Sequence, residues 1–371
     1  MKSVYIHIPF CKNICSYCDF CKFIYNKKWV NQYLIELEHE IATKYKNETI
    51  ETIYIGGGTP SILSLEELTK LFSIISKFEL AKNYEFTFEC NIESITKEQA
   101  IFLIENKVNR LSIGVETFQE KYLIFLNRNN KLDDVKQKIN MLKQVGFNNI
   151  NIDLIYALPN QNLNELDADI DEFLKLGIKH ISTYSLMIEP HTKLYIDNIH
   201  NIDEDLDYKM YNLICEKLKD NAFIHYEVSN FSVPSYESKH NLVYWNNLEY
   251  YGFGVGASGY IDGIRYDNTR NLMKYLKGEW LDNSNLLSLN EKIENEFILG
   301  FRKINGINIE DFYTKYGFDI LKIDAVKKLL NDKKLILSNN DLFINPDYFY
   351  IQNEILIDFM GVDYERKINC N

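Results

Sequence analysis

The amino-acid sequence predicts an α/β protein: a partial (β/α)6 barrel of the TIM type, followed by a small, mainly helical, winged-helix-like C-terminal domain. Two observations lead to this prediction. In the first half of the 371-residue chain, six apolar, strand-like runs alternate with helix-like segments. Beyond residue 288, helix-like runs instead surround one short strand-like pair. Because a closed barrel needs eight units, six units predict an open barrel with a cleft on one side.

The six predicted strands alternate with helices, as expected for parallel strands joined by right-handed crossovers. The strand-like runs are residues 4–8, 52–55, 85–89, 110–115, 150–155 and 180–186. Between the second and third runs, residues 65–78 place their large apolar side chains on one helical face. Ser64 and Thr96 each begin a sequence that fits the capping box of a helix start. Gly146 and Gly177 follow helical runs, where helices commonly end.

After about residue 198 the pattern changes. Residues 205–218 are predicted to be helical, and residues 260–266 to form a hairpin around an Asp-Gly turn. The C-terminal part is predicted to contain helices and one strand pair, at residues 291–301, 309–316, 321–330, 335–343 (the strand pair) and 347–360. We therefore expect a barrel, an extension of the barrel, and a C-terminal domain that acts as a lid or partner surface: residues 1–198, 199–287 and 288–371.

Composition excludes several classes of protein. The net charge of −12 argues against a nucleic-acid binder that relies on phosphate contacts. No apolar run is long enough to span a membrane. Seven cysteines form an odd set, and no signal peptide precedes them, so a disulfide framework is not expected. These features predict a cytoplasmic protein, where clustered cysteines more often hold metal than disulfides.

Three closely spaced cysteines are the most informative feature of the chain. Cys11, Cys15 and Cys18 follow the first strand with the spacing C-x3-C-x2-C, so their thiolates can converge on one soft metal centre. An iron–sulfur cluster with four irons and three cysteine ligands has one iron open to a substrate. A zinc site remains an alternative if Cys21 or His7 supplies a fourth ligand. The other cysteines stand alone in the sequence: Cys90, Cys215 and Cys370.

Further polar residues follow the predicted strands at their carboxyl ends. A glycine-rich run, 56–60, follows the second strand, Glu89 ends the third, Glu116 follows the fourth, and Asp153 lies in the fifth. Because chemistry in such barrels collects at the carboxyl ends of the strands, we expect one site there. The glycines would let backbone amides approach a ligand closely, although a tight turn alone would also explain them.

These motifs together resemble the radical S-adenosylmethionine (SAM) superfamily. The resemblance is greatest to the branch that holds oxygen-independent coproporphyrinogen III oxidases and the HemW haem chaperones. It covers essentially the whole chain and rests on the motifs Tyr5-Ile-His-Ile-Pro-Phe-Cys11, Gly56-Gly-Gly-Thr-Pro60, Arg110-Leu-Ser-Ile-Gly-Val-Glu-Thr-Phe118, Asp153-Leu-Ile-Tyr-Ala-Leu-Pro159 and Tyr226-Glu-Val-Ser-Asn-Phe231.

The resemblance implies two cofactors, a [4Fe–4S] cluster held by Cys11, Cys15 and Cys18 and a SAM molecule on its fourth iron. It also implies a set of SAM contacts: Gly57, Gly58 and Thr59 at the methionyl group, Tyr17 at the adenine, Glu89 and Arg128 at polar ends of the ligand, Asp153 at the ribose, and Tyr5 facing a cofactor or substrate. Glu116 belongs to the same set, although the family usually has glutamine there.

Simpler explanations of these residues remain open. Tyr5 and Tyr17 could be core aromatics, and Glu89 and Asp153 could be helix caps or solvated carboxylates. Arg128 could be a surface residue. The chain also departs from the family at Ala157, where glycine is usual, and lacks histidines that HemW-like proteins often carry after Arg128 and at Ser258.

The sequence favours the chaperone type over the oxidase type. The oxidases have an extension before the cluster strand and a further cysteine where this chain has Phe20. The motif His240-Asn-Leu-Val-Tyr244-Trp245 fits the H-N-x-x-Y-W pattern of HemW-like proteins. The His240 imidazole could bind haem iron, or it could be a histidine whose hydrogen bonds are satisfied within the protein.

We therefore expect a HemW-like protein that binds haem and delivers it to apo-haemoproteins. A donor such as a flavodoxin or ferredoxin would supply electrons to the cluster. The alternative is an oxygen-independent coproporphyrinogen III oxidase, so whether the protein is an enzyme stays open.

Overall fold

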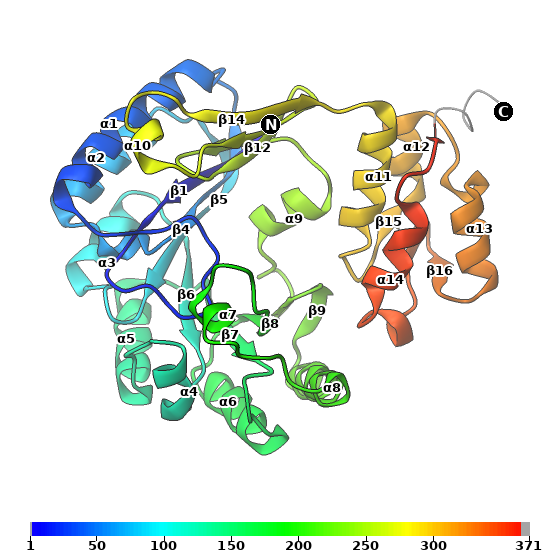
Figure 1. Ribbon diagram of the computed structural model, residues 1–371, viewed down its shortest axis with the longest axis horizontal. Coiled ribbons are helices and arrows are strands. Elements are labelled where there is room, and N and C mark those ends of the chain that lie inside the picture. Colours follow the sequence, from blue (N-terminus) through cyan, green and yellow to red (C-terminus); the bar gives the residue numbers. More distant parts are fainter. Residues whose placement is uncertain (1, 365–371) are drawn as a thin grey trace.

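A computed structural model describes residues 2–364, and its core is one mixed sheet of twelve strands (Figure 1). Seven neighbouring strands of this sheet run parallel to one another, in the order β11-β1-β4-β5-β6-β7-β8. All six predicted strands are present, as β1 (Lys2–Ile8), β4 (Ile50–Gly57), β5 (Leu80–Asn91), β6 (Arg110–Glu116), β7 (Ile150–Tyr156) and β8 (His180–Ser185). The partial (β/α)6 barrel is confirmed.

Helices cover the outer side of this curved sheet (Figure 1). They are α1 (Lys27–Lys44), α2 (Leu65–Ile75), α3 (Lys97–Glu105), α4 (Glu120–Phe125), α5 (Leu132–Val145) and α6 (Leu163–Lys175). Ser64 and Thr96 form the predicted capping boxes at the starts of α2 and α3. α5 ends at Gly146, whose φ of 121° lies in the range that favours glycine. One apolar core fills the space between these helices and the sheet.

The middle of the chain extends the sheet at both edges. After α7 (Lys193–Ile196) and α8 (Glu204–Asp220), β9 (Ile224–Glu227) and β10 (Asn230–Ser232) continue it beyond β8. The chain then crosses through α9 (Lys239–Trp245) to β11 (Tyr250–Phe253), which pairs in parallel with β1 and was not predicted. The Asp-Gly hairpin is confirmed: Asp262 and Gly263 have φ of 53° and 75°. The remaining elements here are β12 (Ser258–Ile261), β13 (Ile264–Asn268), α10 (Leu272–Tyr275) and β14 (Leu281–Leu286), and a short pair, β2 (Phe10–Cys11) and β3 (Phe23–Ile24), lies apart.

The C-terminal part has an apolar core of its own, separate from the barrel core. Its elements are α11 (Leu289–Gly300), β15 (Ile307–Asn308), α12 (Ile309–Tyr316), α13 (Asp324–Asn331), β16 (Leu335–Ser338), β17 (Asp341–Ile344) and α14 (Gln352–Leu356). The predicted helix over 347–360 is confirmed only in part: α14 covers five of these residues, and short 3-10 turns precede and follow it. Phe349, Ile355 and Phe359 from these elements all pack into the same core. The division at residues 198 and 287 remains our proposal, and Cys370 lies outside the described residues.

Within residues 2–364, no helix combines the length and the apolar character needed to cross a lipid bilayer.

A buried carboxylate lies where the barrel meets the C-terminal part. Glu227 ends β9, has no exposed surface, and forms a bridge with Lys303 through its backbone. The backbone N–H of Val228 donates to the carbonyl of Arg302 at 2.9 Å. Burial raises the pKa of the Glu227 carboxyl to about 7, although the backbone N–H of Ser229 opposes this shift.

The raised pKa of Glu227 predicts a pH-dependent stability. Between its ordinary pKa and about pH 7, the folded state holds a proton that the unfolded state has lost, so stability falls as pH rises through this window. We expect Glu227→Gln to make the denaturation midpoint fall less between pH 5 and pH 8. Chemical denaturation followed by circular dichroism measures this slope. Glu216→Gln, at an exposed position, is the matched control, and equal slopes for both variants would contradict the prediction.

Candidate cofactor-binding site

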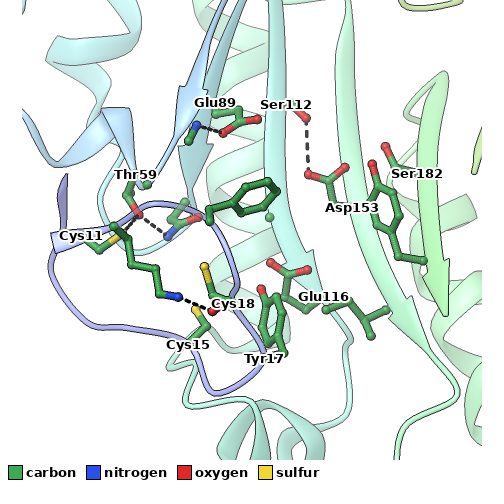
Figure 2. Close-up of a pocket in the computed structure, with 18 of the residues that line it drawn as sticks. Cys11, Cys15, Tyr17, Cys18, Thr59, Glu89, Ser112, Glu116, Asp153 and Ser182 are labelled. Atoms are coloured by element: carbon green, nitrogen blue, oxygen red, sulfur yellow. Dashed lines mark hydrogen bonds between the residues drawn. The ribbon is translucent and has the colours of Figure 1, made fainter. Parts of the chain in front are cut away.

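A cavity of about 370 Å3 lies inside the barrel and opens at the carboxyl ends of its parallel strands. Figure 2 shows the cysteine loop on one side of it and the strands that carry Glu89, Ser112 and Asp153 on the other. Its volume is in the range of small-molecule binding sites. The cavity brings together all the predicted site residues except two, Tyr5 and His240.

The three motif cysteines all line this cavity. Cys11 ends β2, and Cys15 and Cys18 lie in the loop that follows, where the Cys18 N–H donates to the Cys15 carbonyl at 3.3 Å. Burial raises the pKa of the Cys11 thiol to about 11 and also raises the pKa of Cys15 and Cys18. A metal would have to displace these protons, so metal binding by this loop would be coupled to deprotonation of the thiols.

Neither proposed fourth ligand for a zinc ion reaches the cavity. His7 is buried, and both ring nitrogens are engaged, Nε2 with the Cys21 carbonyl at 2.7 Å and Nδ1 with the Tyr5 hydroxyl at 2.9 Å. The Cys21 thiol points instead to the carbonyl of Arg270 at 3.5 Å. Across residues 2–364, no three Cys, His, Asp or Glu side chains are gathered as ligands of a single ion. Three spaced thiols without a fourth ligand fit a polynuclear cluster better than zinc.

The glycine run packs tightly but does not present free amides, which corrects one expectation. The N–H groups of Gly57, Gly58 and Thr59 already donate to Glu89, Ile8 and Phe10 at 2.8–2.9 Å. A Cβ at Gly56 would meet the Glu89 carboxyl carbon at 2.6 Å. The glycines are therefore required for packing. The Thr59 hydroxyl is also engaged, since it donates to Cys11 Sγ at 3.6 Å and accepts from Asn91 Nδ2 at 3.2 Å.

Arg128 is buried beside the cluster loop rather than lying on the surface. Its Nη2 donates to the Gly114 carbonyl at 2.6 Å, and its Nη1 lies 3.8 Å from Glu116 Oε1 and 3.9 Å from Cys15 Sγ. Burial raises the pKa of the Glu116 carboxyl to about 7, against the opposing charge of Arg128. The Glu116 carboxyl thus lies beside a buried cation, at the position where the resemblance leads us to expect glutamine.

Ala157, where the resemblance leads us to expect glycine, adopts a backbone conformation that is unfavourable for alanine. Ala157 follows β7 with a φ of 59°, in the left-handed region that favours glycine. An alanine there is disfavoured by roughly 1–2 kcal/mol relative to the right-handed region. The backbone conformation that the family's glycine suits is therefore retained in this chain despite the substitution.

A polar network that was not predicted supports Asp153 inside the barrel. Asn151 Nδ2 donates to Asp153 Oδ1 at 2.7 Å and to Ser112 and Ser182 at 2.9 Å each. The Asn151 carbonyl oxygen lies 2.6 Å from His180 Nδ1, and burial lowers the pKa of His180, so this imidazole is neutral. The alternation of polar residues along β6 and β7 was the signal that could have revealed this network.

Two predicted residues lie outside the cavity. Tyr5 packs beside Tyr54, at 6.1 Å between ring centroids, and only Tyr54 lines the cavity. His240 is 1% exposed, with Nδ1 2.7 Å from the Thr52 hydroxyl and Nε2 2.8 Å from the Tyr244 hydroxyl. Burial lowers the pKa of His240 to about 3. Both nitrogens are occupied, so the geometry does not support His240 as a haem ligand.

Comparison with known proteins agrees with this geometry. The sequence profile of the Radical SAM superfamily matches residues 5–173. The haem chaperone HemW of Lactococcus lactis is 39% identical over 96% of this chain and 97% of its own length. The chain belongs to the HemW family of radical SAM proteins. The HemW of Bacillus subtilis is 37% identical, over 97% of this chain and 100% of its own length.

The HemW-family chain shares its fold with a solved structure. Coproporphyrinogen III oxidase (HemN) from Escherichia coli, a radical SAM enzyme, superposes with a TM-score of 0.85 over 97% of this chain and 90% of its own, at 19% identity. Membership of the superfamily implies a [4Fe–4S] cluster and SAM as cofactors. When bound, this pair supplies one-electron cleavage of the SAM sulfonium bond, which yields methionine and a 5′-deoxyadenosyl radical. The three thiols and the polar cavity wall fit that pair chemically.

Iron content tests which cysteines hold the cluster. We expect Cys15→Ser to lose bound iron and sulfide, because the thiolate that faces the cavity is removed. Cys21→Ser should keep both, since its thiol points to Arg270. Iron and sulfide assays on anaerobically purified protein measure the outcome. An equal loss in the Cys21 variant would contradict this ligand assignment.

Proposed function

We propose that this HemW-family protein binds haem and delivers it to apo-haemoproteins, with the cluster and SAM governing the transfer. The observation that carries the proposal is the near full-length similarity to proteins named haem chaperone HemW. A second feature agrees with it. Phe20, which stands where the oxidase type has a further cysteine, is 66% exposed beside the cluster loop and is not packed as a core residue.

The proposal assigns the cavity residues to the cofactors by position. Cys11, Cys15 and Cys18 would hold the cluster. The carbonyl groups of Gly57 and Gly58, with the Thr59 hydroxyl and Glu89, would meet the methionyl group at the cluster end. Glu116 and Arg128 form the adjoining wall. Tyr17 and Asp153 would contact the adenine and the ribose.

Hydrogen bonds from neighbouring groups fix the position of the Glu89 carboxylate. The Tyr54 hydroxyl and the Gly57 N–H donate to its two oxygens at 2.7 and 2.9 Å. Burial raises the pKa of the Glu89 carboxyl to about 7. A bound ammonium group would stabilise the ionised form, so ligand binding and loss of this proton are coupled.

The partners follow from the same proposal. Haem would be the cargo, apo-haemoproteins the recipients, and a flavodoxin or ferredoxin the one-electron donor to the cluster. The cytoplasm would be the compartment in which these partners meet. The oxidase alternative is supported only by the shared fold, because this chain and HemN are 19% identical in sequence.

Turnover separates the chaperone from the oxidase. We expect the cluster-loaded protein, given reductant and SAM under anaerobic conditions, to capture haem stoichiometrically and pass it to an apo-cytochrome. With coproporphyrinogen III it should form no decarboxylated product, because the proposed role is binding rather than conversion. Absorption spectroscopy and chromatography of the porphyrins measure both. Catalytic formation of protoporphyrinogen would overturn the proposal.

His240 provides a separate prediction. Because His240→Ala leaves the buried Thr52 hydroxyl and the part-buried Tyr244 hydroxyl without their partner, we expect a loss of roughly 1–3 kcal/mol in the free energy of unfolding. The absorption spectrum of bound haem should not change. His39→Ala, at an exposed position, is the control and should have neither effect. A changed haem spectrum with unchanged stability would restore His240 as a haem contact.

A further inference from the structure

The cavity follows strand β6 along its length, and Arg110 lies at its inner end. Arg110, Ser112, Gly114 and Glu116 all line the cavity, on one face of the strand. Glu116 ends the strand beside the cysteine loop, and Arg110 begins it. At about 3.3 Å per residue, the two ends lie roughly 20 Å apart. The inner end is therefore distant from the region assigned to the cluster.

The Arg110 guanidinium is buried without a direct ion pair or hydrogen bond. The residue is 2% exposed, and its Nε has no hydrogen-bond partner. Among residues 2–364, no ion pair or hydrogen bond of the side chain is found. Arg128, by contrast, contacts Glu93, Glu116 and the Gly114 carbonyl. Arginines are almost never fully buried unless paired, because an uncompensated buried charge is strongly unfavourable.

None of the side chains around Arg110 pairs with it directly. His180 and His240 are neutral, because burial lowers the pKa of both, and their ring nitrogens are hydrogen-bonded to other residues. The carboxylates whose pKa values respond to the charge of Arg110 are Glu89 and Asp153. Neither forms an ion pair or hydrogen bond with Arg110: Glu89 accepts hydrogen bonds from Tyr54 and Gly57, and Asp153 accepts them from Asn151 and Ser112.

We propose that Arg110 is the anchor for a carboxylate of a ligand that enters the inner half of the cavity. A guanidinium binds a carboxylate through two parallel hydrogen bonds, and a water-poor wall strengthens that pairing. The inference rests on the proposed function, which makes the carboxylate a propionate of haem. The other carboxylate available is that of SAM, which the assignment above places at the cluster end.

Esterified haem tests this inference directly. The full-length, cluster-loaded protein is titrated anaerobically with haem and with haem dimethyl ester, in the same dilute detergent. We expect the wild type to bind the free acid at least about tenfold more tightly than the ester, the scale of one charged hydrogen-bonded pair. This comparison needs no variant, so it does not depend on whether a variant folds.

Substitution then assigns the effect to one residue. We expect Arg110→Gln to weaken binding of the free acid by about tenfold or more and to leave the affinity for the ester unchanged. Arg110→Lys should recover part of the loss, since it keeps the charge but not the planar fork. Arg265→Gln, on β13 outside the cavity, is the matched control and should bind both ligands as the wild type does.

Four results would overturn the inference. Equal affinity of the wild type for acid and ester would do so while leaving haem binding intact. An equal loss for both ligands in Arg110→Gln would show a structural role. A loss of SAM affinity with unchanged haem affinity would assign Arg110 to the SAM carboxylate. Failure of the wild type to bind either porphyrin would contradict the proposed function itself, and the inference with it.

Discussion

The parallel alignment of the strands from β11 to β8 is the constraint on which the site depends. Parallel strands end at the same edge of a sheet, so the loops that follow them meet in one place. The register makes this concrete, because Ile8, just before the cysteine loop, pairs with Gly57 in the glycine run. Cys11 and Asp153, which are distant in the sequence, therefore line one cavity even though their elements need not touch each other.

The same alignment leaves a polar barrel interior that has to be closed at the other end. Helix α9 does this: Glu85 on β5 accepts hydrogen bonds from the backbone N–H groups of Lys239 and His240 in its first turn, at 3.1 and 3.0 Å. The His240 side chain then forms a hydrogen bond with the Thr52 hydroxyl on β4, at 2.7 Å from Nδ1. The H-N-x-x-Y-W motif thus joins the helix to the sheet, and its histidine and tyrosine satisfy each other. A motif shared within a family can mark closure of the barrel as well as ligand contact.

Features that depend on residues close together in the sequence could be predicted, and features that depend on residues far apart in the sequence could not. Strands, capping boxes and the Asp-Gly hairpin depend on neighbouring residues, and they were predicted, as was the gathering of residues at the strand ends. Partners distant in sequence were not: β11 is four residues long and joins β1 only in the fold. The burial of Arg128 and the occupied nitrogens of His240 also depend on distant chain segments. The hydrogen bonds that the glycine N–H groups donate within the protein could not be predicted from the sequence either.

The two buried arginines beside the cavity differ in whether other groups of the protein pair with them. Arg128 is paired with carboxylates and a carbonyl, so its charge is already compensated and it can fix the wall beside the cysteines. The Nε of each arginine lacks a partner, but only Arg110 has no ion pair or hydrogen bond of its side chain among residues 2–364. An uncompensated buried charge is strongly unfavourable, so stability alone does not explain an arginine there. For an arginine without a protein partner on the wall of a cavity, we propose that a ligand entering the cavity is the explanation.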